Sequence, residues 1–167
     1  MGSGRPQRSD ADSISPAKLT QRVKTLEKEL ARQQEPQRFD VSLDGTHRLG
    51  AKAAKLGIVE FADFQCPYCR HFYKDTFPQL KKQILDTGKA SFMVSNFPLD
   101  FHAHAMNAAI AVTCVAQQDT AAYWKMQQSM FDSPQKLGDT FFTQLAHQYG
   151  LDDKKYQACM ADPAQKR

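Results

Sequence analysis

The chain has 167 residues, 41% of them hydrophobic, which is enough to bury one core of ordinary size. Its formal net charge is +4 and its basic residues are dispersed, whereas a nucleic-acid-binding protein would show a basic face interleaved with aromatic residues. We therefore expect no nucleic-acid partner. No stretch reaches the roughly 18 apolar residues of a membrane-spanning helix, and no signal peptide is evident.

The N-terminal part is predicted to be a polar leader followed by one helix. Residues 1–13 are polar, and we expect them to be disordered. Ser15 and Pro16 then favour a helix start, because Ser is a preferred N-cap and Pro suits the first helical position. We expect this helix over residues 14–35, with its end at Glu35-Pro36.

This helix carries an apolar stripe at spacings of four, three and four residues, as in a heptad repeat: Leu19, Val23, Leu26 and Leu30. We expect the stripe to join two or more chains into a homo-oligomer. The alternative is that it packs on the chain's own domain, since two heptads are fewer than the three or four that argue for a coiled coil.

The following residues predict an α/β domain over 39–99 and a helical subdomain over 100–167. Strands are expected at 39–43, 58–63 and 90–96, and a helix at 66–86 that is kinked or broken at Pro78. The helical block is expected to contain helices at 103–118, 121–131, 139–149 and from the Asp152 cap to residue 161. The second strand, the helix and the third strand would form a βαβ unit.

The motif Cys66-Pro67-Tyr68-Cys69 lies where the predicted strand at 58–63 passes into a helix. This position puts the first sulfur at a helix N-terminus, where free N–H groups and the helix dipole stabilise a thiolate. Cys69 follows one turn further on, close enough to close a small disulfide ring with Cys66. The motif therefore predicts thiol–disulfide exchange.

Half of a zinc site has the same spacing, so metal binding is the alternative for this motif. A zinc site needs two more ligands at short spacing. The other cysteines, Cys114 and Cys159, are isolated and distant, and His102 and His104 match such a pair poorly. We therefore expect no metal and no other cofactor.

The segment 59–69, which reads Val-Glu-Phe-Ala-Asp-Phe-Gln-Cys-Pro-Tyr-Cys, resembles the active-site strand and helix of the DsbA-like thioredoxin-fold proteins. The similarity continues through 96–100, 105–116 and 151–156, in the family's order. The resemblance implies a thioredoxin-like fold with an inserted helical subdomain. It also implies a protein-disulfide oxidoreductase or isomerase.

Three residues of the site receive roles from this resemblance. Cys66 would exchange disulfides with substrate thiols, Cys69 would be the buried resolving cysteine, and Glu60 would carry the proton of Cys69. A carboxylate in an apolar strand has a raised pKa and can act as a base near neutral pH. The alternative for Glu60 is a strand residue whose carboxylate only reaches solvent.

Two further features each allow two interpretations. Cys114 and Cys159 either form a structural disulfide, as a second cysteine pair in some relatives implies, or remain buried free thiols. We expect the disulfide. His71 either supports the Cys66 thiolate or is a solvated surface residue.

Family members continue into a loop with a cis-proline opposite the active site, then a strand hairpin and a final helix. The remaining prolines here, Pro98, Pro134 and Pro163, do not precede a matching strand, so we expect an incomplete thioredoxin-like fold. The alternative to an active enzyme is a catalytically impaired fragment or an interaction module. Such a module would associate through the N-terminal helix and an open sheet edge.

The resemblance further implies cysteine-containing exported proteins as substrates and a redox partner that resets the active site. It implies a periplasmic location, or a membrane anchor that faces the periplasm. Pro67-Tyr68 is the dipeptide of glutaredoxins and of several periplasmic isomerases, so oxidase and isomerase activity are both open.

Overall fold

The computed structural model describes residues 15–34 and 38–166. The predicted leader at 1–13 and the predicted helix end at Glu35-Pro36 lie outside the described residues. The chain divides into two compact units, Met1–Ser42 and Leu43–Arg167.

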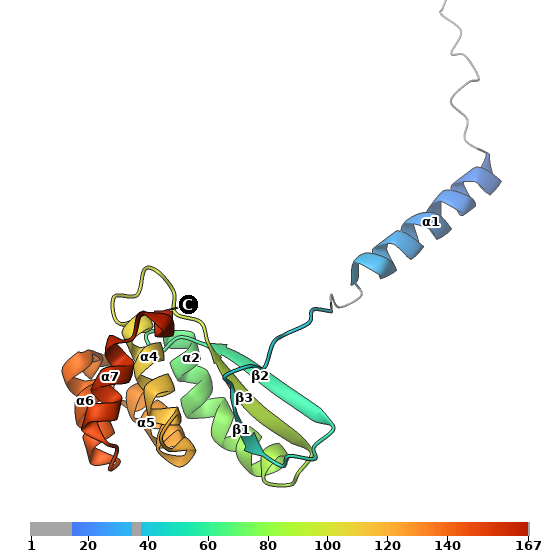
Figure 1. Ribbon diagram of the computed structural model, residues 1–167. Coiled ribbons are helices and arrows are strands. Elements are labelled where there is room, and N and C mark those ends of the chain that lie inside the picture. Colours follow the sequence, from blue (N-terminus) through green and yellow to red (C-terminus); the bar gives the residue numbers. More distant parts are fainter. Residues whose placement is uncertain (1–14, 35–37, 167) are drawn as a thin grey trace, which may run out of the picture. The chain divides into compact units, whose positions relative to one another are not determined.

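The first unit contains the helix α1, Pro16–Gln34 (Figure 1). Its start is as predicted, because the N–H of Lys18 lies 3.4 Å from Oγ of Ser15 and Pro16 is the first helical residue. The four residues of the apolar stripe are 50 to 59% exposed. The amphipathic helix is thus confirmed, and its apolar stripe is open to solvent.

The second unit is built on a three-stranded sheet in the order β1-β3-β2. The strand β3, Ala90–Asn96, lies in the middle. It pairs in parallel with β2, Leu56–Ala62, and antiparallel with β1, His47–Gly50. Among the described residues, the outer edge of β2 therefore has no neighbouring strand, as the sequence predicted for the strand before the cysteines.

The prediction of a first strand at 39–43 is wrong, because the first strand is β1 at His47–Gly50. Phe39, Val41 and Leu43 alternate with polar residues as a strand would, but all three are exposed and lie outside the sheet. A short alternating segment becomes a strand only where a neighbouring strand accepts its hydrogen bonds and side chains. On that side of β3 the place is taken by β1.

A helical run over residues 67–85, called the redox helix below, connects β2 to β3. It alternates between α-helical and π-helical turns: α2 (Pro67–His71), η2 (Phe72–Thr76), α3 (Phe77–Leu80) and η3 (Lys81–Leu85). The predicted irregularity at Pro78 is confirmed, since this proline lies in the first turn of α3, directly after a π turn. Proline has no N–H, and a widened turn accommodates its ring.

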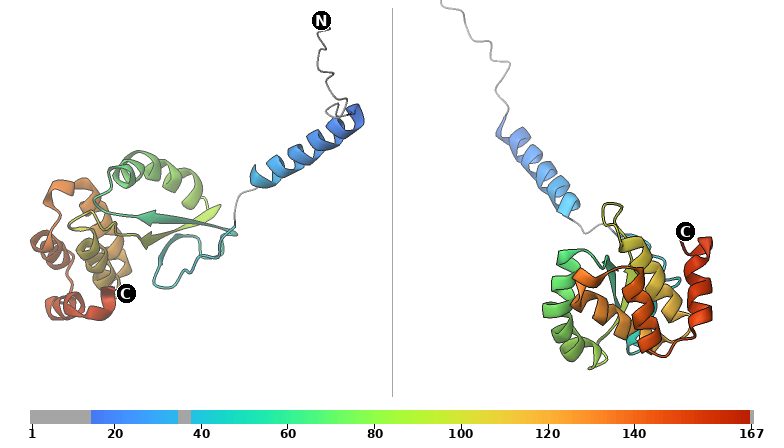
Figure 2. Two further views of the ribbon diagram at one scale, coloured as in Figure 1. Left: turned by 90° about the horizontal axis from the view of Figure 1, so that it is seen from above. Right: turned by 90° about the vertical axis from the view of Figure 1, so that its left-hand side faces the viewer.

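The helical subdomain follows β3 and agrees closely with the predicted ranges. It contains α4 (Ala105–Ala116), α5 (Thr120–Asp132), η4 (Pro134–Lys136), α6 (Asp139–Gln148), α7 (Asp153–Ala161) and η5 (Pro163–Lys166). The carboxylate of Asp152 caps α7 by accepting from the N–H of Lys155 at 3.0 Å, as predicted. Figure 2 shows the redox helix over one face of the sheet and the helices α4–α7 gathered beside it.

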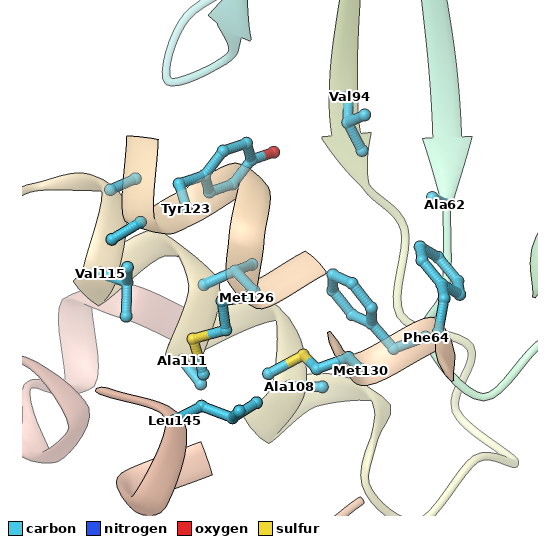
Figure 3. Packing of buried hydrophobic residues seen from close by; sticks show 14 of the residues in the cluster. Ala62, Phe64, Val94, Ala108, Ala111, Val115, Tyr123, Met126, Met130 and Leu145 are labelled. Atoms are coloured by element: carbon cyan, nitrogen blue, oxygen red, sulfur yellow. The ribbon is translucent and has the colours of Figure 1, made fainter. Parts of the chain in front are cut away.

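One hydrophobic core joins the sheet, the redox helix and the helical subdomain. Phe92 of β3 is fully buried against Phe77 of the redox helix, with ring centroids 4.9 Å apart. Figure 3 shows Met126 and Met130 of α5 packed beside α4. The mixed α/β, thioredoxin-like fold is confirmed, and its core holds the redox helix rigidly against β2 and β3.

Candidate active site

Cys66 and Cys69 lie at the junction of β2 with the redox helix. Cys66 is the N-cap residue of α2, with extended backbone angles, and its carbonyl accepts from the N–H of Arg70 at 3.1 Å. Pro67 is the first helical residue, which suits its fixed φ and missing N–H. Both cysteines are free, and Cys66 is close enough to Cys69 to influence the pKa of its thiol. The motif is therefore placed as the sequence predicted.

Cys69 is only half-buried, whereas the resemblance implied a buried resolving cysteine at this position. Cys69 packs against the core on one side, but its position in the first helical turn leaves the other side open among the described residues. Desolvation, together with the neighbouring Cys66 and Glu60, nonetheless raises the pKa of the Cys69 thiol to about 11. Cys69 thus remains a thiol near neutral pH and needs a base to become a nucleophile.

Glu60 of β2 is the carboxylate that interacts electrostatically with Cys69. It is half-buried, and its Oε2 is buried without a hydrogen-bond partner. Desolvation by burial raises the pKa of Glu60 from 4.5 to about 7. At neutral pH this carboxyl can therefore take up or release a proton, which supports a base for Cys69 rather than a residue that only reaches solvent.

Asp63, which the sequence did not single out, organises the turn around the cysteines. Its side chain is almost fully buried and accepts from the N–H of Gln65 at 2.7 Å and from the N–H of Leu99 at 2.8 Å. The same carboxylate lies 2.8 Å from Nδ1 of His102. Its backbone carbonyl accepts from the N–H of Cys66 at 3.1 Å, and the Asp63 backbone acts against the rise in the pKa of the Cys69 thiol.

The loop between β3 and α4 is held against the redox turn through these contacts. His102 and Leu99 of this loop bind Asp63, and the N–H of His104 donates to Oε1 of Gln65 at 2.5 Å. His102 and His104, to which the sequence analysis assigned no role, thus have a structural one. An acidic residue at the end of an apolar strand was visible in the sequence, but its neighbours did not reveal whether its carboxylate is buried or reaches solvent.

The position of His71 does not match a role in supporting the Cys66 thiolate. Its Nδ1 lies 2.8 Å from the Asp75 carboxylate one turn further along the helix, and its side chain is 76% exposed. This i,i+4 pair holds the imidazole on the solvent side of the helix. The structure therefore corresponds to the solvated alternative for His71.

The other two cysteines lie in the helical subdomain, apart from the motif. Cys114 of α4 and Cys159 of α7 are joined by a disulfide, the arrangement we expected from the resemblance. This bond ties the last helix to the buried helix α4. Among residues 15–34 and 38–166, no group of three or more His, Cys, Asp or Glu side chains could hold a metal ion.

The comparisons with known proteins agree with this fold and site. A family model described as thioredoxin matches residues 42–167, so the chain belongs to the thioredoxin family. The disulfide bond formation protein D of Bacillus subtilis is 33% identical over 92 residues, which are 54% of this chain and 40% of that protein. The probable disulfide bond formation protein D of Bacillus anthracis is 31% identical over 96 residues, 58% of this chain and 44% of that protein.

Solved structures place the chain within the DsbA-like part of this family. Oxidised BdbD from Bacillus subtilis has a TM-score of 0.64 and 26% identity, covering 75% of this chain and 72% of that one. The Wolbachia pipientis protein alpha-DsbA1 shares the fold, with a TM-score of 0.65 at 23% identity over 75% of this chain and 64% of that one. The resemblance to DsbA-like thioredoxin-fold proteins is thereby confirmed.

The chain spans about two fifths of the length of the curated relatives that it matches. None of the helices in the described part of the chain has both the length and the apolar character that crossing a membrane requires.

Proposed function

We propose that the chain is a protein thiol–disulfide oxidoreductase in which Cys66 exchanges disulfides with cysteine-containing polypeptides. The observation that carries the proposal is the arrangement of three groups. Cys66 caps the redox helix, Cys69 follows in the first turn, and Glu60 interacts electrostatically with Cys69 and has a pKa of about 7. The relatives named as disulfide bond formation proteins support the same chemistry.

The reaction proceeds in two displacement steps. The Cys66 thiolate attacks one sulfur of a substrate disulfide, so that a Cys66–substrate bond forms and the other substrate sulfur leaves as a thiolate. Cys69 then gives its proton to the Glu60 carboxylate and attacks the sulfur of Cys66. The second substrate sulfur leaves, the substrate disulfide has been reduced, and the cysteine pair has been oxidised. The reverse sequence oxidises a substrate dithiol.

The test is exchange between the reduced chain and a disulfide-bonded peptide. We expect one peptide disulfide to be reduced for each Cys66–Cys69 disulfide formed, as measured by mass spectrometry after acid quenching. The Cys66→Ala variant should lose the reaction completely, because Cys69 stays protonated near neutral pH. Tyr68→Ala is the matched control, since Tyr68 is 82% exposed and holds no sulfur. Exchange that persists in Cys66→Ala would show that another thiol reacts.

We further propose that α1 assembles the chain into a homo-oligomer, which would favour isomerase activity because paired sites can hold one misfolded substrate. The open apolar stripe of α1 supports this. An interaction module is the second candidate, favoured by the unpaired outer edge of β2 among the described residues and by Leu56 and Phe61, which are 66% and 52% exposed there. Peptide exchange that depends on Cys66 separates the two.

Replacing Leu26 by Glu should release monomers, because it puts a charge in the middle of the stripe. Light scattering coupled to size-exclusion chromatography measures the mass of the assembly. Gln21→Glu introduces the same charge on the opposite face of α1 and should leave the assembly intact. A monomeric parent chain, or an oligomer unchanged by Leu26→Glu, would contradict the role of α1.

Relatives of this class lead us to propose exported proteins as substrates, a redox partner that resets the cysteine pair, and a periplasmic or periplasm-facing location. The disulfide between Cys114 and Cys159 supports an oxidising compartment, since such bonds are rare where thiols are kept reduced.

A further inference from the structure

A buried polar cluster lies under the redox helix, apart from the two cysteines. Tyr73 of the redox helix and Tyr123 and Gln127 of α5 are each at most 2% exposed. The amide of Gln127 binds both phenols: its Nε2 donates to the Tyr123 hydroxyl at 2.7 Å, and its Oε1 accepts from the Tyr73 hydroxyl at 3.2 Å. The Tyr73 hydroxyl proton is therefore engaged in a hydrogen bond to Gln127. The Tyr123 hydroxyl only accepts from Gln127, so its own proton is available for a second hydrogen bond.

The strand register brings Glu60 to the same place. Val94 of β3 pairs with Glu60 of β2 on one side and with His47 of β1 on the other. Residues paired in this way point to the same face of a sheet, so the three side chains form a row. Tyr123 lies over this row, with its ring centroid 4.6 Å from that of His47. Figure 3 shows the Tyr123 ring reaching from α5 toward the strand that carries Val94.

Each of the two groups has one unused hydrogen-bonding capacity. The Tyr123 hydroxyl has a proton to donate, and Oε2 of Glu60 is buried without a partner. A buried carboxylate without a partner is costly, and a phenol that turns its proton toward the charged carboxylate relieves that cost. The row of side chains therefore pairs an available donor with the acceptor that needs one.

We propose that Tyr123, oriented by Gln127, is a positioning residue that donates a hydrogen bond to the Glu60 carboxylate whenever Glu60 is ionised. The inference rests on the proposed function, because it gives Tyr123 a part in the proton transfer from Cys69. When Cys69 passes its proton to Glu60, the carboxyl becomes neutral and the Tyr123 hydroxyl is released. The thiolate so formed attacks the Cys66 sulfur, and the substrate thiolate departs. When Glu60 returns the proton to solvent, the hydrogen bond to Tyr123 forms again.

Tyr123 also borders a cavity, which Glu60 itself does not line. A cavity of about 400 Å³ is lined by Tyr123, His47 and Val94, and it also borders on Asn96 of β3 and Thr113 of α4. Burial lowers the pKa of His47, so this imidazole is neutral at the pH where Glu60 titrates and adds no charge to the row.

The titratable groups that face Glu60 come from three elements. Cys69 and Tyr73 lie on the redox helix, Tyr123 lies on α5, and His47 lies across Val94 on β1. Burial raises the pKa of both tyrosines well above their usual range, so each remains a neutral donor at any pH where the protein works. Only the Glu60 carboxyl titrates near neutrality in this set, with a pKa of about 7.

The test is the pH titration of Glu60, followed by the ¹³C chemical shift of its carboxyl carbon in the reduced chain. Tyr123→Phe removes the donor, so the midpoint should rise by about one pH unit, as expected for the loss of one hydrogen bond to a charged group. Tyr156→Phe is the matched control, because Tyr156 of α7 is equally buried and its hydroxyl has no hydrogen-bond partner. The control should leave the midpoint unchanged.

A second variant covers the case in which Tyr123→Phe fails to fold because the Gln127 amide loses its acceptor. Tyr123→Phe combined with Gln127→Leu and Tyr73→Phe removes all three members of the polar cluster, so no buried partner is left unpaired, and it should show the same rise. An unchanged midpoint in a folded variant, or an equal shift in Tyr156→Phe, would overturn the proposal. The midpoint requires no turnover, so this result is independent of whether peptide exchange succeeds.

Discussion

Replacing Glu60 by Gln is expected to slow the resolution of the mixed disulfide about 100-fold near pH 7, the lower range for the loss of a general base. The same substitution should make the folded chain more stable at pH 8. Both effects have one cause, which is the burial that raises the pKa of Glu60 to about 7. A carboxylate that is costly to bury is also a good proton acceptor for a thiol.

The direction of the stability change follows from where the proton is bound. The folded-state pKa of Glu60 is above its ordinary value of 4.5, so between these values the folded chain keeps a proton that the unfolded chain has lost. Stability therefore falls as the pH rises from about 4.5 to about 7, and the cost is fully present above that window. Full linkage would amount to about 3 kcal/mol, and screening of a half-buried side chain reduces it to about 2 kcal/mol.

Urea unfolding at pH 4 and pH 8 measures this difference. Glu60→Gln should match the parent chain at pH 4 and exceed it by about 2 kcal/mol at pH 8. Glu29→Gln, on the exposed surface of α1, makes the same chemical change without burial and should show no gain at either pH. A variant that is equally stabilised at both values would trace the effect to packing rather than to charge.

The local chemistry of this protein was predictable because one short segment contains it. The apolar strand, the cysteine pair and the helix start are contiguous, so the pattern from residue 58 to 69 predicts where both sulfurs lie. The helices of the subdomain were predictable for the same reason, since caps such as Asp119 and Asp152 act within three residues.

The contacts that sequence reasoning missed all join residues that are distant in the chain. Asp63 and His102 are 39 positions apart, and Tyr73 and Gln127 are 54 apart. Nothing within a short window distinguishes a buried carboxylate that binds a loop from one that reaches solvent. The first strand was misplaced for a related reason, because β1 is defined by its pairing with β3 more than by its own residues.

Glu60 illustrates both the local features that the sequence predicts and the distant contacts that it does not. Its place in an apolar strand predicted a raised pKa, and the structure supports that with a value of about 7. The residues that we propose to act on it, Tyr123 and Gln127, lie more than 60 positions further along the chain, and no local pattern connects them with Glu60.

Replacing Cys69 by Ala is expected to trap the chain in a mixed disulfide with its substrate. Cys66 remains able to attack, so the first displacement should proceed and leave a substrate fragment attached to its sulfur. The second displacement needs a nucleophile beside that sulfur, and Cys69 is the cysteine in contact with it. The remaining cysteines, Cys114 and Cys159, are bonded to each other and cannot replace it.

The expected size of the effect follows from proximity. A well-oriented intramolecular group reacts as though it were present at about 10⁵ M or more, which millimolar external thiol cannot match. The adduct should therefore last at least about 1,000-fold longer in Cys69→Ala than in the parent chain. Intact mass measured at intervals after mixing with a disulfide-bonded peptide would follow it, with occupancy approaching one adduct per chain.

Two comparisons decide whether the trapped species has this origin. Cys66→Ala should form no adduct, because the protonated Cys69 thiol is a poor nucleophile near neutral pH, and the adduct of Cys69→Ala should map to Cys66 in peptide digests. An adduct that clears as fast in Cys69→Ala as in the parent chain would mean that substrate thiols resolve it unaided. Cys69 would then be needed only to form the Cys66–Cys69 disulfide of the oxidised protein, and Glu60 would not act as the proton acceptor when the mixed disulfide is resolved.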